Sequence, residues 1–100
     1  MSFETVKSRV AAALPQLAGL DATVELVTDE GKLFIDGTVD PPTISSQDGP
    51  ADCTIRISSE NLLKLMDGKL DPMLAYTFGK LKISGRTGVA MKIASAFKDG

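Results

Sequence analysis

The sequence predicts an α+β domain in which helices cover one face of a small β-sheet. Three observations support this prediction. The chain has 100 residues, a length at which a single core is normal. Several short segments alternate apolar and polar residues, which is typical of strands with one wet face. Other segments carry apolar residues three and four apart, which indicates amphipathic helices. We therefore expect one domain over residues 1–100.

The first helix is expected at the N-terminus. Ser2 is a candidate N-cap, and Glu4 follows in the first turn, where the helix dipole favours an anion. Pro15 is expected to end or kink the helix near Leu14. One face of this helix carries apolar residues at helical spacing, namely Phe3, Val6, Val10, Ala13, Leu14 and Leu17.

The next part of the chain predicts a β-hairpin. In 22–27, Ala22, Val24 and Leu26 alternate with Thr23, Glu25 and Val27, and in 32–36, Leu33 and Ile35 alternate with Lys32, Phe34 and Asp36. The turn between them is expected at 29–31. A short third strand is expected at 43–45. The polar residues of 46–50 then predict a loop.

The second half starts with another alternating segment, 53–58, which predicts a strand. Ser58 or Ser59 is expected to cap a helix that ends near Gly68. Asp71 and Pro72 then predict a second helix start, with Asp as the cap and Pro at the first helical position.

The last strand is expected from Lys80 to Ser84, with Lys80 and Lys82 on a solvated face. A turn is expected at 85–88, and the final helix should direct Val89, Ala90, Ile93, Ala94 and Phe97 toward the core. The turn 85–88 could hold a phosphate. It lacks the glycine and lysine spacing of a P-loop, so a plain strand-to-helix turn is favoured.

Composition excludes several classes of function. The chain has no histidine and one cysteine, so the usual zinc-ligand sets and the Ser-His-Asp or Cys-His catalytic systems cannot be assembled from it. No pair of carboxylates has a spacing that suggests shared acid–base work. The net charge of −2 argues against binding to nucleic acid. We predict a protein that is not an enzyme and needs no cofactor.

Other features bear on location. No apolar run approaches the roughly 18 residues that a membrane-spanning helix needs, and the N-terminus shows no signal-peptide pattern. We expect a cytoplasmic protein. Cys53 falls on the apolar side of its strand and is expected to be a buried small hydrophobe.

The apolar helices of the second half have two interpretations. From periodicity alone, most such stripes are ordinary core. Met66, Met73 and Met91, however, have flexible side chains that suit an adaptable apolar surface. Periodicity favours ordinary core, and the methionines favour a cavity.

Four segments of the second half resemble the sterol carrier protein 2 family in their order and spacing: ADCTI (51–55), LMDGKLDP (65–72), GKLKISG (79–85) and GVAMKI (88–93). The first half matches in pattern only. The resemblance implies a five-stranded, mostly antiparallel sheet with helices on one face and an apolar tunnel between them. It also implies a non-enzymatic domain that binds sterols, fatty acids, fatty acyl-CoAs and similar lipids.

The resemblance and the apolar pattern together define the expected site. The candidate tunnel-lining residues are Phe34, Leu62, Leu65, Met66, Met73, Tyr76, Phe78, Ile83, Met91, Ile93 and Phe97. Arg9 and Arg86 are candidates for contact with an anionic head group.

Two functions fit this site. The first is a broad-specificity lipid carrier. The alternative is an accessory module that presents a lipid-like intermediate, for example of isoprenoid quinone synthesis, to a partner enzyme. The expected partner is a lipid ligand and not nucleic acid, and transient membrane contact and a homodimer are both left open.

Overall fold

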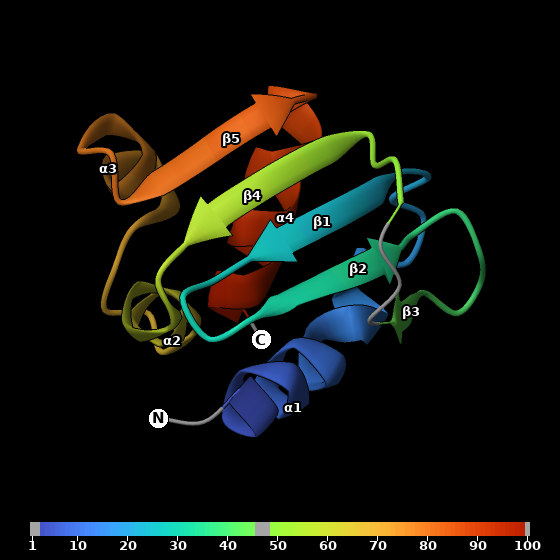
Figure 1. Ribbon diagram of the computed structural model, residues 1–100, viewed down its shortest axis with the longest axis horizontal. Helices are drawn as coiled ribbons and strands as arrows, with labels where there is room; N and C mark the ends of the chain where they lie inside the picture. Colours follow the sequence, from blue (N-terminus) through green and yellow to red (C-terminus); the bar gives the residue numbers. More distant parts are fainter. Residues whose placement is uncertain (1–2, 46–48, 100) are drawn as a thin grey trace.

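The computed structural model describes residues 3–45 and 49–99 (Figure 1). Its elements confirm the α+β class and follow the predicted order: α1 (Phe3–Ala13), the 3-10 helix η1 (Leu14–Leu17), β1 (Thr23–Val27), β2 (Lys32–Asp36), β3 (Thr43–Ser45), β4 (Cys53–Ile57), α2 (Ser59–Met66), α3 (Pro72–Thr77), β5 (Leu81–Gly85) and α4 (Thr87–Asp99). The predicted cap Ser2 and residues 46–48 of the predicted loop lie outside the described residues.

The five strands form one sheet in the order β3-β2-β1-β4-β5. β1 pairs antiparallel with β2 and parallel with β4, while β2–β3 and β4–β5 are antiparallel. The mostly antiparallel sheet is therefore confirmed, with one parallel pair at its centre. Val24 lies opposite Ile35 on one side and Cys53 on the other. This register aligns the apolar residues of the three central strands on one face.

The helices lie on that face of the sheet, with α4 crossing behind β4 and β1 (Figure 1). α2 contacts both α1 and α4, which closes the helical layer. The largest fully buried side chains come from α1, η1, α2 and α4 and from the strands beneath them: Val6, Val10, Leu17, Val24, Leu26, Leu33, Ile35, Leu62, Leu65, Leu81, Ile93 and Phe97. The single core expected from the apolar periodicity is thus formed between helices and sheet.

The ends of the helices follow local rules. α1 ends at Ala13, and Pro15 lies inside η1, as the proline predicts. Ser58 is the cap of α2, since its Oγ accepts the backbone N–H of Asn61 at 3.1 Å. Asp71 caps α3 through one carboxylate oxygen, which accepts the N–H groups of Met73 at 2.8 Å and Leu74 at 3.2 Å.

The predicted turn 85–88 is too long. Gly85 is the last residue of β5, and α4 already begins at Thr87. Gly85 has a φ of +90°, and a Cβ there would lie 2.5 Å from the carbonyl oxygen of Asp52. A glycine therefore lets β5 end against the start of β4 and lets α4 begin at once.

Candidate functional site

The interior between α2, α4 and the sheet brings together five of the predicted lining residues. Leu62, Leu65 and Met66 come from one face of α2, and Ile93 and Phe97 come from α4. All five belong to one buried apolar cluster. Two more predicted residues, Ile83 of β5 and Met91 of α4, are partly buried and pack against it.

This interior is closed around its central side chains. Leu62, Leu65, Ile93 and Phe97 are each exposed to 2% or less. The neighbouring Ser59 is a buried polar residue, also 2% exposed, whose backbone N–H donates to Asp29 at 2.7 Å. The structure therefore gathers five of the predicted lining residues in one buried cluster, and the tunnel itself stays a prediction.

Three other predicted lining residues lie at the surface on or beside α3. The exposed fractions are 61% for Met73, 42% for Tyr76 and 72% for Phe78. α3 has only six residues and buries Pro72 and Ala75. Its apolar content suggested an interior helix, but most of that apolar surface faces outward.

Phe34 lies on the opposite face of the sheet from the helices. In β2 the buried residues are Leu33 and Ile35, so the side chain between them points the other way. Phe34 is half-buried there, in register with Glu25 and Ser45. The alternation of Leu33 and Ile35 was the signal in the sequence that could have placed it correctly.

The two candidate head-group residues lie apart. Arg9 of α1 donates to Asp67, just after α2, with an Nη2–Oδ1 distance of 2.8 Å. Arg86 is exposed between β5 and α4, and its backbone N–H donates to the carbonyl oxygen of Asp52 at 3.2 Å. The two residues therefore lie at different parts of the surface, and the Arg9 side chain is held there by Asp67.

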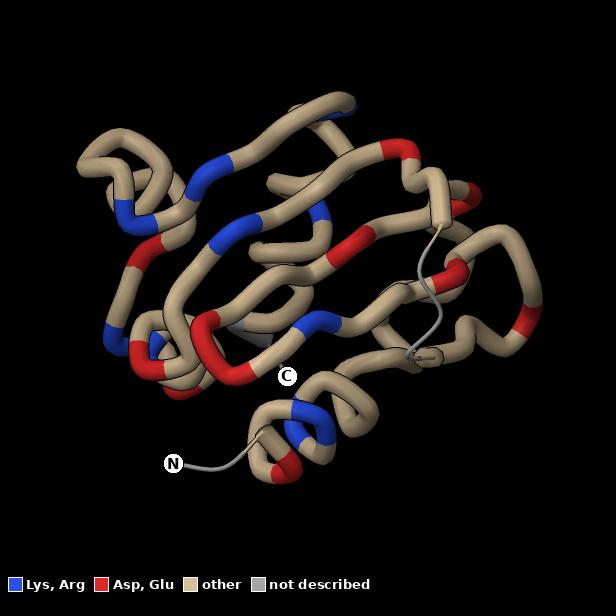
Figure 2. The backbone as a smooth tube through the Cα atoms, viewed as in Figure 1, with Lys and Arg blue, Asp and Glu red and all other residues tan. Residues whose placement is uncertain are grey.

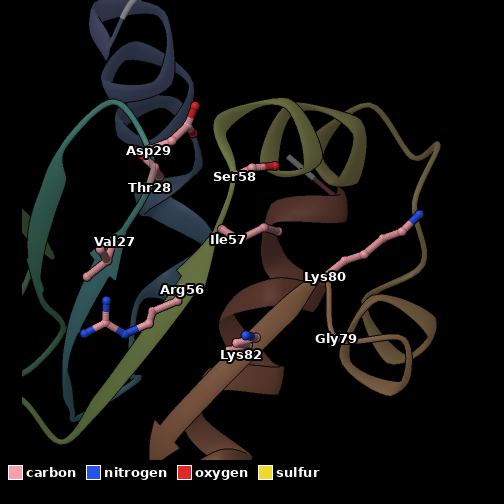
Figure 3. Close-up of a pocket in the computed structure, with 9 residues that line it drawn as sticks. All are labelled: Val27, Thr28, Asp29, Arg56, Ile57, Ser58, Gly79, Lys80 and Lys82. Atoms are coloured by element: carbon pink, nitrogen blue, oxygen red, sulfur yellow. The ribbon is translucent and has the colours of Figure 1, made fainter.

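An open cleft of about 320 Å³ lies where the β1–β2 turn, the end of β4 and the start of β5 meet (Figure 3). Three basic residues line it, Arg56, Lys80 and Lys82. Arg56 and Lys82 are directly opposite each other in the β4–β5 register. This basic cleft was not predicted, because the pairing of β4 with β5 brings the charges together and cannot be read from spacing.

The same cleft contains one carboxylate, that of Asp29. Figure 3 shows it directed away from Arg56 and Lys82. The pKa of Asp29 is lowered, first because the backbone N–H of Ser59 donates to its carboxylate. The Asp29 carboxylate thus binds the first residue of α2, and the three basic side chains give the cleft a net positive charge.

Cys53 is buried on β4, as expected from the alternation. Burial raises the pKa of its thiol, and the nearby Asp52 raises it further, while Arg86 acts in the opposite direction. The residue is thus a poor nucleophile. Within residues 3–45 and 49–99, no helix has the length and apolarity to cross a membrane.

Comparison with known proteins places these features in context. The model of the SCP-2 sterol transfer family matches residues 3–98. Sterol carrier protein 2 of Oryctolagus cuniculus is 44% identical over 75 residues, which are 75% of this chain and 12% of that protein. For sterol carrier protein 2 of Rattus norvegicus the identity is 43% over 77 residues, which are 77% of this chain and 13% of that protein. The chain thus spans a small part of the length of these relatives.

Solved structures show the same fold at lower identity. The solution structure of the sterol carrier protein domain 2 of Helicoverpa armigera has a TM-score of 0.75 and 23% identity, and the match covers 97% of this chain and 85% of that one. The apo form of sterol carrier protein 2 from Yarrowia lipolytica has a TM-score of 0.71 and 18% identity, with coverage of 92% and 78%. The UbiJ-SCP2 ubiquinone synthesis protein has a TM-score of 0.69 and 17% identity, with coverage of 95% and 87%.

Proposed function

Because the chain belongs to the SCP-2 sterol transfer family, we propose that it is a non-enzymatic lipid-binding domain that holds the hydrocarbon part of a lipid between its helices and its sheet. Sterols, fatty acids and fatty acyl-CoAs are the proposed ligand classes. The observation that carries the proposal is the family match over residues 3–98, which includes every element around the apolar interior. A cytoplasmic location stays a prediction.

The proposed lining is the buried part of the predicted set. It consists of Leu62, Leu65 and Met66 on α2 and Ile93 and Phe97 on α4. These side chains offer no specific hydrogen bond, so a ligand is selected by its hydrocarbon content and shape. Met66 supports broad specificity, since its flexible thioether can adapt to different guests.

Without a ligand, the free energy of the chain favours a closed interior. A dry cavity of about 300 Å³ would cost roughly 7 kcal/mol at about 24 cal/mol per Å³. That cost is comparable with the entire stability of a small domain, about 5–15 kcal/mol. The low exposure of Leu62, Leu65, Ile93 and Phe97 agrees with this expectation. We propose that the helical layer moves outward when a lipid enters.

Hydrocarbon burial can supply the energy for such opening. A hexadecyl chain has about 14 methylenes, worth roughly 0.8 kcal/mol each, or about 11 kcal/mol in total. Association costs about 4–15 kcal/mol. The affinity should therefore be modest and should increase with chain length.

The proposal is tested by displacement of a fluorescent fatty acid, with native mass spectrometry of the purified protein as a second measurement. Ala94, 2% exposed on α4, offers a filling variant, Ala94→Leu. We expect this variant to bind about tenfold more weakly, because the added methyl groups occupy space equivalent to about two methylenes of ligand.

The matched control is Ala12→Leu on the exposed face of α1, which should bind as the wild type does. Circular dichroism checks that both variants fold. If the wild-type protein binds no sterol, fatty acid or fatty acyl-CoA, the proposal is wrong.

The alternative, an accessory module that presents a lipid-like intermediate to an enzyme, has one relevant neighbour, the UbiJ-SCP2 ubiquinone synthesis protein. At 17% identity this likeness shows the fold alone. The carrier function therefore remains the better supported of the two.

A further inference from the structure

The outer face of α3 carries a cluster of exposed apolar side chains, the α3 patch, defined as Met73, Leu74, Tyr76 and Phe78. Their exposed fractions are 61%, 53%, 42% and 72%. Val39, in the loop after β2, is the other large hydrophobic residue that is exposed in the described part of the chain. The α3 patch is therefore a concentrated feature and not part of a generally apolar surface.

The patch is held in place by contacts on the inner side of α3. Pro72 and Ala75 are buried, and α3 packs against β5 and α4. The backbone N–H of Lys80 donates to the carbonyl oxygen of Ala75 at 2.8 Å, which fixes the exit from the helix. The exposed apolar side chains are thus presented by an anchored helix.

Lys69 and Lys80 lie on either side of α3 in the chain, and Lys82 follows on β5, opposite Arg56 of β4. These four residues are defined as the basic rim. Figure 2 shows Lys and Arg on β4, on β5 and on the segments on either side of α3. Arg56 and Lys82 lie directly opposite each other across two strands. Like charges in that position destabilise a sheet, so their presence calls for an explanation beyond folding.

Three of the acidic groups nearby have other partners. Asp71 caps α3, and Asp29 accepts the N–H of Ser59. Glu25, on the same sheet face as Arg56, pairs with Lys32 at 4.0 Å. Among the described residues, no ion pair is formed by Arg56, Lys69, Lys80 or Lys82.

The segment that contains α3 is more basic than the chain as a whole. Residues 64–82 contain four lysines and two aspartates, a net charge of +2, although the whole chain has a net charge of −2. At the other end of the β1–β2 hairpin, a second cleft is lined by Asp21 and Asp40. The segment around α3 is therefore basic, whereas the acidic residues at the same end of the molecule, Asp29, Glu30 and Glu60, belong to the β1–β2 turn and to α2.

We propose that the α3 patch and the basic rim together form a docking surface for an anionic phospholipid bilayer. Apolar and aromatic side chains flanked by lysines are the composition of surfaces that lie in the membrane interface. The side chains of Met73, Leu74 and Phe78 enter the acyl boundary, Tyr76 lies at the level of the head groups, and the lysines meet the lipid phosphates.

A second copy of the chain is a poorer occupant for this surface. Four half-exposed side chains of this size present on the order of 400 Å², whereas a stable dimer needs about 800 Å² from each partner. A twofold axis through the patch would also bring two basic rims together. A bilayer containing anionic lipid satisfies both the apolar patch and the charge.

The experiment is flotation of the protein with vesicles of phosphatidylcholine, with or without phosphatidylglycerol. We expect binding to the vesicles that contain phosphatidylglycerol, and the bound fraction should fall as sodium chloride is raised. Phe78→Ser should weaken binding about tenfold, which is the loss of one large apolar side chain from the interface. Val39→Ser, at the other end of the molecule, is its control and should bind unchanged.

The charge is tested by the double variant Lys80→Gln with Lys82→Gln. It should lose about tenfold in binding to vesicles with phosphatidylglycerol. Lys92→Gln, exposed on α4, is the control for one removed charge. Equal binding of wild type, Phe78→Ser and the double lysine variant would overturn the proposal.

Two further outcomes would also contradict it. A wild-type protein that self-associates through Phe78 in sedimentation, without floating, would assign the patch to a second copy. The other outcome is that soluble glycerol phosphate suppresses flotation at a concentration at which sodium chloride has no effect. That result would show that the surface binds phosphate anions and not a bilayer. A chain that floats but takes up no lipid contradicts only the proposed function, and one that takes up lipid but does not float contradicts only this inference.

Discussion

α4 and α3 are both rich in apolar residues, yet the fold uses them in different ways. α4 has 13 residues and buries Val89, Ala90, Ile93, Ala94 and Phe97. α3 has six residues, buries Pro72 and Ala75 and exposes the four side chains of the α3 patch. α4 crosses behind β4 and β1, whereas α3 lies beside β5 at the edge (Figure 1). The position of a helix relative to the sheet, and not its apolar content, decides whether its side chains become core.

The sharpest test of this difference substitutes one phenylalanine in each region. Phe97→Ala should reduce the free energy of unfolding by about 3–5 kcal/mol, because it removes a side chain that is 2% exposed and leaves a cavity. Phe78→Ala should change it by less than about 0.5 kcal/mol, since the side chain is 72% exposed. Urea unfolding followed by circular dichroism measures both.

If Phe97→Ala does not fold, Phe97→Leu keeps the comparison, with an expected loss of about 1 kcal/mol. Equal losses at positions 78 and 97 would show that α3 is as much a part of the core as α4, and would remove the basis of the α3 patch.

Gly79, two residues before β5, and Gly85, the last residue of β5, give a second comparison of the same regions. Both have positive φ, +77° at Gly79 after α3 and +90° at Gly85 before α4. A Cβ at Gly79 meets nothing within 4 Å, so Gly79→Ala should cost only the backbone strain, about 1–2 kcal/mol.

Gly85→Ala should cost more, about 2–4 kcal/mol, because its Cβ would also lie 2.5 Å from the carbonyl oxygen of Asp52. Thermal unfolding of the two variants under the same conditions is the measurement. A smaller loss at Gly85 than at Gly79 would mean that β5 can move away from the start of β4 at little cost.

The smallest expected effect on stability concerns the hydrogen bonds that hold the N-termini of α2 and α3. α3 is capped by its own Asp71, whereas α2 is also held from the β1–β2 turn by Asp29. The pKa of Asp29 is lowered in the folded chain, chiefly by the N–H of Ser59. A lowered carboxyl pKa contributes stability above the usual Asp value of about 3.9, and this contribution is lost as the pH falls through the native pKa.

Asp29→Asn should therefore be less stable than the wild type at neutral pH, and the difference should shrink as the pH is lowered below the usual Asp range. Urea titrations at a series of pH values follow this convergence. Glu30→Gln removes the same formal charge from the same turn and is the control. A constant difference at every pH would show that the carboxylate charge of Asp29 does not support α2.

The fold could be predicted from the sequence because its signals are local. Alternation in 53–57 and 81–84, the caps Ser58 and Asp71, and Pro15 are determined by residues that neighbour one another in the chain. Part of the buried interior could also be predicted from the sequence, since Leu62, Leu65 and Phe97 lie on continuous apolar stripes of their helices. Such stripes predict burial well when the helix crosses a sheet.

The surface could not be predicted in the same way, because it depends on strand order. The order β3-β2-β1-β4-β5 puts β5 at an edge and leaves α3 with an outer face. Only the β4–β5 register brings Arg56 and Lys82 together. Phe34 is a different case, since the alternation of its strand already placed it away from Leu33 and Ile35.

The position of β5 at the edge of the sheet also affects the tendency of the protein to aggregate. An edge strand offers a row of free N–H and C=O groups to any other extended chain, and this is a common beginning of amyloid-like stacking. In β5 the run is five residues long, carries Lys82 at its second position and ends at Gly85. A strand this short, charged near one end and terminated by glycine at the other, is a poor template for fibre growth.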